Sequence, residues 1–162
     1  MPLGSAETLS LAGMMGAGKS TVGRHLARLL GRRFVSTDAL VEARAGRPIA
    51  RIFAEEGEPF FRTLERAVVA ALAGPLVVDL GGGAFCHPAS AEHLLRAGRV
   101  VFLDVSAAEA ARRIGAAGDR PLSASWEPLL GRRLALYRRA HLAVRVDRNA
   151  PEAVARRILG LL

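Results

Sequence analysis

Cysteine is almost missing from this chain of 162 residues, which contains only Cys86. A single cysteine cannot form an internal disulfide or supply a cluster of thiolate ligands for a metal ion. No apolar run approaches the roughly 20 residues that a membrane-spanning helix needs. Residues 1–10 also lack the basic flank and apolar stretch of a signal peptide. We therefore expect a cytoplasmic protein without a membrane partner.

Lysine is also nearly absent: Lys19 is the only one, although lysine and arginine together number 23. The lysine ammonium is a compact point charge and the arginine guanidinium a planar fork, so we expect Lys19 to occupy a position that arginine cannot fill. Acidic residues number only 15, which gives a formal net charge of +8. Such a surplus suits nucleotides, acidic metabolites or nucleic acid. An arginine-rich surface typical of a GC-rich genome explains the total equally well.

Aromatic residues are few, at 5% of the chain with one Trp and one Tyr. Proteins that bind single-stranded nucleic acid combine a basic groove with aromatic side chains that stack on bases. No base-stacking motif accompanies the positive charge, so a nucleic-acid partner is disfavoured. Hydrophobic residues, in contrast, make up 51% of the sequence, which is enough for a folded core.

Apolar segments alternate with amphipathic ones along the whole chain. Strands are predicted at residues 8–13, 33–36, 76–80, 100–105 and 142–147. Helices are predicted at residues 19–30, 39–44, 49–55, 60–72, 89–97, 107–113, 128–139 and 151–162, with a loop at 115–125. Apolar strands between helices indicate a three-layer α/β fold, in which helices cover both faces of a parallel sheet. The length fits a single domain over residues 1–162.

The most specific motif is Gly-Met-Met-Gly-Ala-Gly-Lys-Ser at residues 13–20, which matches G-x-x-x-x-G-K-[S/T] in full. Glycines let several backbone N–H groups point at one phosphate, and the dipole of the following helix adds positive charge. Lys19 is expected on the β- and γ-phosphates and Ser20 on Mg²⁺. The alternative, a glycine-rich turn that binds nothing, is disfavoured by the position of the single lysine. The expected nucleotide contacts in the loop are Gly16, Ala17, Gly18, Lys19, Ser20 and Thr21.

Three further features narrow the reaction. Asp38 follows the second strand, at the edge of the sheet where α/β proteins bind ligands. It could bind a substrate hydroxyl, accept its proton or simply cap the next helix. Arg62 and Glu65 are either a surface ion pair or an arginine held in place to bind an anionic substrate. Residues 81–83, all glycine, form either a flexible turn or a surface that a ligand can approach closely.

Together, several segments of the sequence resemble the shikimate kinase family, P-loop enzymes that are similar to nucleoside-monophosphate kinases. The segments are GMMGAGKSTVGRHLA, STD, GRPIARIF, GEPFFRTLE, DLGGGA, RPL and RRLALYR, and they span nearly the whole chain. The resemblance implies a P-loop NTPase fold whose five parallel strands have the order 2-3-1-4-5. It also implies ATP and Mg²⁺ as cofactors and transfer of the γ-phosphoryl group to the 3-hydroxyl of shikimate.

On the acceptor side, the resemblance implies roles for four residues. Asp38 is similar to the aspartate that holds the substrate hydroxyls, and Gly82 to a backbone contact with substrate. Arg62 and Arg133 resemble the pair that binds the substrate carboxylate. The helices within residues 38–66 are the expected substrate-binding region. From local sequence alone, Arg133 is more typical of a basic helix surface, since it lies in a run with Arg132, Arg138 and Arg139.

On the nucleotide side, Arg120 resembles the arginine of a mobile lid, here residues 114–125, that meets the phosphates. Lys19, Asp38 and Arg120 are thus the expected catalytic residues. Arg113 and residues 148–151, which end in Pro151, resemble the contacts to adenine.

The sequence departs from the family at Ser36, where an aspartate that helps to hold the Mg²⁺ shell is usual. Asp79 ends the third strand, where many P-loop proteins carry their Mg²⁺-associated aspartate. We hypothesise that Asp79 replaces the missing carboxylate, so that Ser20 and Asp79 are the expected metal-site residues. In the alternative, Asp79 hydrogen-bonds nearby backbone and only water completes the Mg²⁺ shell.

Three alternatives to a shikimate kinase remain open. One is a related small-molecule kinase, similar to gluconate kinase or acting on another hydroxy acid. The second is a non-catalytic ATP-binding module, suggested by Ser36. The third is a basic nucleic-acid-associated protein, which the scarcity of aromatic residues disfavours. No long heptad or hydrophobic edge is evident, so we expect a monomer.

Overall fold

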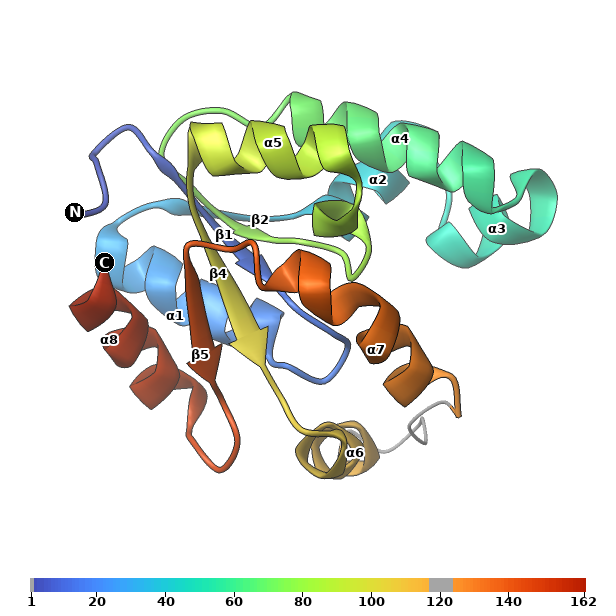
Figure 1. Ribbon diagram of the computed structural model, residues 1–162. Helices are drawn as coiled ribbons and strands as arrows, with labels where there is room; N and C mark the ends of the chain where they lie inside the picture. The colour runs from blue at the N-terminus through green and yellow to red at the C-terminus, as the bar shows by residue number, and fades with distance from the viewer. Residues whose placement is uncertain (1, 117–123) are drawn as a thin grey trace.

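The structure, a computed structural model, describes residues 2–116 and 124–162. Its strands form one parallel sheet in the order β2-β3-β1-β4-β5 (Figure 1). This confirms the predicted fold class and strand order. The strands are β1 (Thr8–Ala12), β2 (Arg33–Ser36), β3 (Leu76–Asp79), β4 (Gly98–Asp104) and β5 (Leu142–Arg145).

Helices cover both faces of this sheet, with α1 and α8 on one face and α4 and α5 on the other (Figure 1). The helices of the described chain are α1 (Lys19–Leu30), α2 (Thr37–Ala45), α3 (Ile49–Glu56), α4 (Glu58–Ala70), α5 (Pro88–Ala97), α6 (Ala107–Ala116), α7 (Trp126–Tyr137) and α8 (Pro151–Leu161). A short 3-10 helix, η1 (Ala84–Cys86), precedes α5 and was not predicted. No helix of the described ranges has the length and apolar character needed to cross a membrane.

The main hydrophobic core lies around the central strands. Every residue of β1 is buried, including the side chains of Leu9 and Leu11. The apolar face of α1, with Val22 and Leu26, packs onto this core. Burial of these aliphatic side chains removes apolar surface from water, the dominant favourable contribution to folding. The core thereby fixes the loop between β1 and α1 at the carboxyl edge of the sheet.

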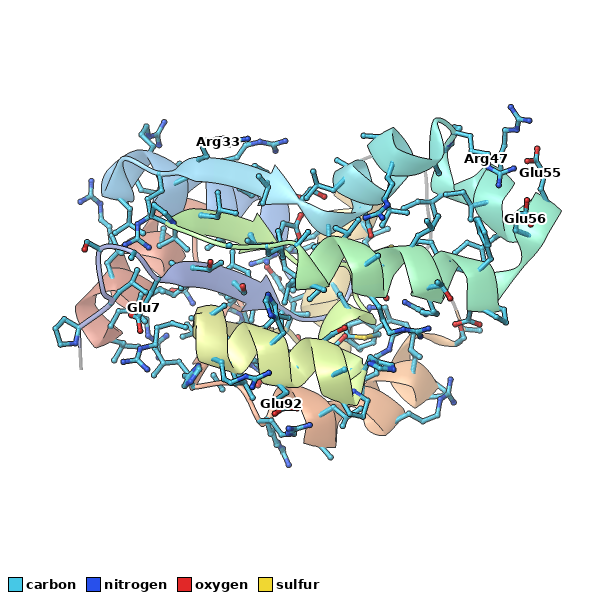
Figure 2. The ribbon with its side chains drawn as sticks, turned by 90° about the horizontal axis from the view of Figure 1, so that it is seen from above. Glu7, Arg33, Arg47, Glu55, Glu56 and Glu92 are labelled. Atoms are coloured by element: carbon cyan, nitrogen blue, oxygen red, sulfur yellow. The ribbon has the colours of Figure 1, made fainter. Side chains whose placement is uncertain are left out.

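A second, smaller hydrophobic cluster holds α2, α3 and α4 together as a corner beside the sheet. It consists of Val41, Ile52, Phe61 and Val68. At the tip of this corner, Arg47 forms ion pairs with both Glu55 and Glu56 (Figure 2). The corner is thus packed separately from the main core, and it carries Asp38 and Arg62.

The boundaries differ from prediction in two places that matter for the site. Ser36 is the N-cap of α2, and its Oγ accepts a hydrogen bond of 3.4 Å from Ala39 N. The alternative in which Asp38 caps this helix is therefore wrong, because Asp38 lies within the first turn. Helix α6 continues to Ala116, so the predicted loop start at residue 115 is also wrong. Arg120 lies outside the described residues, as does most of the expected lid.

Candidate active site

The loop between β1 and α1 has a backbone that only glycine accommodates well. A Cβ atom at Gly13 would lie 2.8 Å from the carbonyl oxygen of Leu103, and its φ is +147°. Gly18, the N-cap of α1, has φ 84° and ψ 23° in the left-handed region. Helix α1 therefore starts abruptly at Lys19, with its first N–H groups free of intrahelical partners. Such a helix start is a ready anion-binding site.

The single lysine folds back over this loop. Lys19 Nζ donates hydrogen bonds to the carbonyl oxygens of Gly13, at 2.8 Å, and Met14, at 3.2 Å. Desolvation lowers the pKa of Lys19, while the nearby carboxylates of Asp79 and Asp38 oppose this shift. An anion bound at the loop would further favour the charged ammonium.

A cavity of about 670 Å³ opens beside the loop. This is within the range of small-molecule sites. Most of the residues predicted to contact the nucleotide line this cavity. The exceptions are Ala17, which is fully buried, and Arg120, which lies outside the described residues. The lining residues are Gly16, Gly18, Lys19, Ser20, Thr21, Asp79, Arg112, Arg113, Ile114, Arg148, Asn149, Ala150 and Pro151.

Arg113 lines the cavity and bonds to three separate residues. Its guanidinium donates to the carbonyl oxygens of Ala17, at 3.1 Å, and Val146, at 2.8 Å. The third contact is an ion pair of 2.9 Å with Glu109, a buried carboxylate on α6. Hydrogen bonds from Arg112 and Arg113 lower the pKa of Glu109 to about 2, so it stays charged. Arg113 thus holds the loop in place as well as lining the cavity. The sequence did not predict that Glu109 positions this arginine.

Ser20 and Asp79 meet at the phosphate end of the cavity. Ser20 Oγ donates a short hydrogen bond to Asp79 Oδ2. This contact brings the two residues predicted for the metal site together. Mg²⁺ in nucleotide sites is usually held by one or two carboxylates, substrate phosphates and several waters. A serine hydroxyl and a carboxylate in contact fit that chemistry.

Three charged side chains predicted for the acceptor converge on the glycine triplet after β3. A Cβ atom at Gly81 would lie 2.5 Å from Asp38 Oδ1, and one at Gly82 would lie 2.9 Å from Arg133 Nη1. At Gly83, it would lie 2.5 Å from Arg62 Nη1. Any larger residue would displace one of these side chains, so glycine at all three positions lets the charged groups pack closely on the backbone.

Arg62 is held by two carboxylates of its own helix, α4. Its ion pair with Glu65 is 2.8 Å long and that with Glu58 is 3.2 Å long. Glu65 is only 3% exposed, so its ion pair with Arg62 is not the surface ion pair of the first alternative. Desolvation raises the pKa of Glu65, and the Arg62 guanidinium opposes this shift. Glu65 therefore fixes the position of Arg62.

Arg133 differs from its arginine neighbours on and after α7. It is half-buried, whereas Arg132, Arg138 and Arg139 are exposed. One turn later, the buried Tyr137 stacks on Phe102, with ring centroids 5.0 Å apart. Its hydroxyl donates to the carbonyl oxygen of Gly82.

This tyrosine was missed by sequence reasoning. Burial raises the pKa of Tyr137 to about 12, so the hydroxyl keeps the proton that it donates. The one feature of the sequence that could have drawn attention to Tyr137 is that it is the only tyrosine. Tyr137 thereby attaches the helix that carries Arg133 to the glycine triplet.

Asp38 keeps an open face to solvent, yet its carboxylate is perturbed. Partial desolvation raises its pKa, and the charge of Asp79 raises it further, while Lys19 has the opposite effect. On the inner side, Thr37 Oγ1 accepts a hydrogen bond of 2.8 Å from Gly81 N. This bond ties the start of α2 to the end of β3. A carboxylate with a raised pKa is a better proton acceptor than a free aspartate.

Comparisons with known proteins give matches over nearly the whole chain. The family model described as Shikimate kinase matches residues 15–162. A shikimate kinase of Mycobacterium avium (strain 104) is 47% identical over 94% of this chain and 91% of its own length. One of Rhodococcus erythropolis is 43% identical over 94% of this chain and 95% of its own length.

Solved structures give the same result. Shikimate kinase from Acinetobacter baumannii in complex with shikimate superposes with a TM-score of 0.86 at 36% identity, covering 96% of this chain and 92% of that one. A gluconokinase from Sinorhizobium meliloti has a TM-score of 0.60 at 20% identity, covering 95% and 90%, and shares the fold alone.

Proposed function

The chain belongs to the shikimate kinase family, and we propose that it transfers the γ-phosphoryl group of ATP to the 3-hydroxyl of shikimate. One observation carries the proposal: Asp38, Arg62 and Arg133 gather over the glycine triplet, next to the phosphate-binding loop. Two guanidinium groups suit the planar carboxylate of a hydroxy acid, and a carboxylate suits its hydroxyls. The relative from Acinetobacter baumannii is described as a complex with shikimate.

The donor half of the proposed site is the 670 Å³ cavity. The backbone N–H groups of Gly16, Ala17 and Gly18 would bind the phosphates, with Lys19 on the β- and γ-phosphates. Thr21, Arg113 and Pro151 would contact the rest of the nucleotide. We include Arg120 as the arginine that meets the phosphates, on the resemblance alone.

Mg²⁺ would be held by Ser20 and Asp79 together with the phosphates. The contact between the Ser20 hydroxyl and the Asp79 carboxylate supports this assignment. When bound, Mg²⁺ would supply positive charge to the β- and γ-phosphates. This hypothesis accounts for an active enzyme with serine at position 36, and it disfavours the reading as a non-catalytic ATP-binding module.

In the acceptor half, Arg62 and Arg133 would bind the substrate carboxylate, and Gly82 would add a backbone contact. Asp38 would hold the attacking hydroxyl in line with the γ-phosphorus and receive its proton. The transition state of phosphoryl transfer is loose, so most of the catalytic effect comes from positioning and from cations around the transferred group. Among the described side chains, Lys19 is the cation that we expect beside the transferred phosphoryl group.

Steady-state kinetics test the proposal directly. We would measure ADP release with ATP, Mg²⁺ and shikimate, and compare quinate, gluconate and nucleoside monophosphates as acceptors. Release that depends on shikimate supports the proposal, and turnover with gluconate instead would favour the related kinase. Arg62→Gln should raise the KM for shikimate far more than that for ATP, whereas Arg66→Gln on the same helix is the matched control. Equal effects on both KM values would remove Arg62 from the acceptor site.

We further propose a cytoplasmic monomer without a nucleic-acid partner. A dimer in sedimentation velocity would contradict the monomer. A strongly salt-dependent affinity for DNA or RNA would contradict the absence of a nucleic-acid partner.

A further inference from the structure

A second cavity lies at the outer edge of the sheet, away from the proposed active site. Its volume is about 370 Å³, within the range of small-ligand pockets. It shares no lining residue with the nucleotide cavity. We name it the edge cavity, and it is lined by residues of β2, α2, α4, β3 and the segment between α4 and β3.

The floor of the edge cavity is apolar. Val68 belongs to the small cluster of the α2–α4 corner, while Leu72 belongs to the main core. The cavity therefore lies at the seam between the two clusters. Leu40 is 36% exposed at this seam and Ala71 is exposed as well, so apolar surface faces solvent there. Contiguous apolar surface in a concave site is typical of ligand binding.

Two arginines, Arg33 and Arg44, complete the wall (Figure 2 labels Arg33). Within residues 2–116 and 124–162, neither guanidinium forms an ion pair or a hydrogen bond to another side chain. Most other arginines of the α2–α4 corner do, such as Arg47 and Arg51 with Glu55. The edge cavity thus combines an apolar floor with two cations that lack partners in the described chain.

We propose that the edge cavity binds a small organic acid with an apolar body, whose carboxylate pairs with Arg33 and Arg44. Charge complementarity selects an anion, and the apolar floor selects a flat hydrocarbon body over an inorganic anion. We also infer that its occupancy alters acceptor binding. Leu40 and Arg44 lie on the helix that carries Asp38, and Val68 lies on the helix that carries Arg62. A ligand at the seam contacts both helices, so it biases how the corner sits against the sheet.

Calorimetric titration with 2-naphthoate tests the binding. Saturating shikimate is present throughout, so that the carboxylate-binding arginines of the acceptor site are occupied. We expect 2-naphthoate to bind, and the uncharged 2-naphthalenemethanol, which has the same ring system, to bind more weakly. No binding of 2-naphthoate in the presence of saturating shikimate, or equal affinity for the acid and the alcohol, would overturn the proposal.

Variants locate the site. Arg33→Gln/Arg44→Gln should weaken binding of 2-naphthoate about tenfold, the effect of two partly exposed ion pairs. Arg96→Gln/Arg156→Gln removes the same charge from exposed positions on α5 and α8 and should leave the affinity unchanged. Ala71→Leu fills the cavity but keeps both arginines, and it should also weaken binding. If both arginine double variants behave alike, the naphthoate binds elsewhere and the proposal is wrong.

The effect on the acceptor rests on the proposed function and has a separate readout. Saturating 2-naphthoate should change the KM for shikimate at least twofold and leave the KM for ATP unchanged, and the double variant of Arg33 and Arg44 should abolish the change. Binding without any change in KM would leave a ligand site and refute its coupling to the acceptor. If light scattering instead shows a dimer that the double variant dissociates, a second copy of the chain covers the cavity and the proposal fails.

Discussion

Ser36 at the end of β2 and Asp79 at the end of β3 are register partners on adjacent parallel strands. Side chains of such partners extend to the same face of a sheet. A carboxylate at either position therefore reaches the same region, beside Ser20 of the phosphate-binding loop. This relationship gives a physical basis for moving the carboxylate of the metal site from one strand to its neighbour.

Asp79→Asn should weaken metal binding by on the order of 10- to 100-fold, a typical cost of removing a group that orients a metal site. Binding of Mn²⁺ to the protein with ADP, followed by electron paramagnetic resonance, measures this without turnover. Adding Ser36→Asp to Asp79→Asn should restore much of the affinity. Asp104→Asn removes a carboxylate from the end of β4 and is the matched control. Unchanged Mn²⁺ affinity in Asp79→Asn would refute the hypothesis that Asp79 replaces the carboxylate missing at position 36.

Lys19→Arg should lower kcat by about 100-fold or more, since a cation aimed at the transferred phosphoryl group has effects of this size. The ammonium donates to two carbonyl oxygens inside the loop, at 2.8 and 3.2 Å, a space that a planar guanidinium does not match. Arg28→Lys, an exposed exchange later in the same helix, should leave kcat unchanged. If Lys19→Arg kept wild-type turnover, the argument from the single lysine would be mistaken.

Glu65→Gln should raise the KM for shikimate roughly tenfold, because a hydrogen bond to a charged group contributes about 1.5–3 kcal/mol. The KM for ATP should stay the same. Glu58→Gln removes the exposed partner of the same arginine and should change the KM for shikimate much less. Steady-state kinetics with each substrate varied in turn check this, and equal effects of the two variants would contradict a positioning role for Glu65.

Tyr137→Phe removes one hydroxyl and leaves the carbonyl oxygen of Gly82 without that donor. The free energy of unfolding should fall by about 0.5–1.5 kcal/mol, the net contribution of a typical hydrogen bond, because Gly82 is half-buried and its carbonyl oxygen keeps the Cys86 thiol as a donor. Urea denaturation measures this loss. Because α7 carries Arg133, the KM for shikimate should rise too, whereas a purely structural tyrosine would leave it unchanged.

Activity should decline in acid earlier than for an ordinary aspartate, because desolvation and the charge of Asp79 raise the pKa of Asp38 above its usual 3.8. Only the carboxylate form accepts a proton, so kcat/KM for shikimate should fall with unit slope below that raised pKa. Asp38→Asn removes the carboxylate that accepts the proton, so the activity that remains should lose this decline in acid. A decline that persists in this variant would argue that another group titrates. The pH profile is measured at saturating ATP and metal.

The sequence predicted the sheet and the phosphate-binding loop well, because both depend on local pattern. Strand β4, with the sequence GRVVFLD, contains an unbroken apolar run, and such a run by itself indicates a central parallel strand. The loop motif specifies its own backbone, since glycines such as Gly18 adopt φ angles that other residues avoid.

Other parts of the site depend on contacts between distant segments and were not predicted. Tyr137 and Thr37 act through partners 55 and 44 residues away, to which no short motif points. Glu109 pairs with arginines of its own helix, but its burial required the fold. The contacts of the glycine triplet could not be predicted either. The sequence shows the three glycines, but only the fold shows which side chain approaches each of them. Helix ends also shifted, because Ser36 rather than Asp38 caps α2.

The only tryptophan of the chain, Trp126, is buried at the start of α7, and its Nε1 donates a hydrogen bond of 3.0 Å to the carbonyl oxygen of Met15. The one indole therefore lies against the phosphate-binding loop itself. Its emission wavelength and intensity depend on that hydrogen bond and on the local field. We therefore expect nucleotide binding at the loop to change the emission of this indole, which stopped-flow fluorescence would measure without any attached dye.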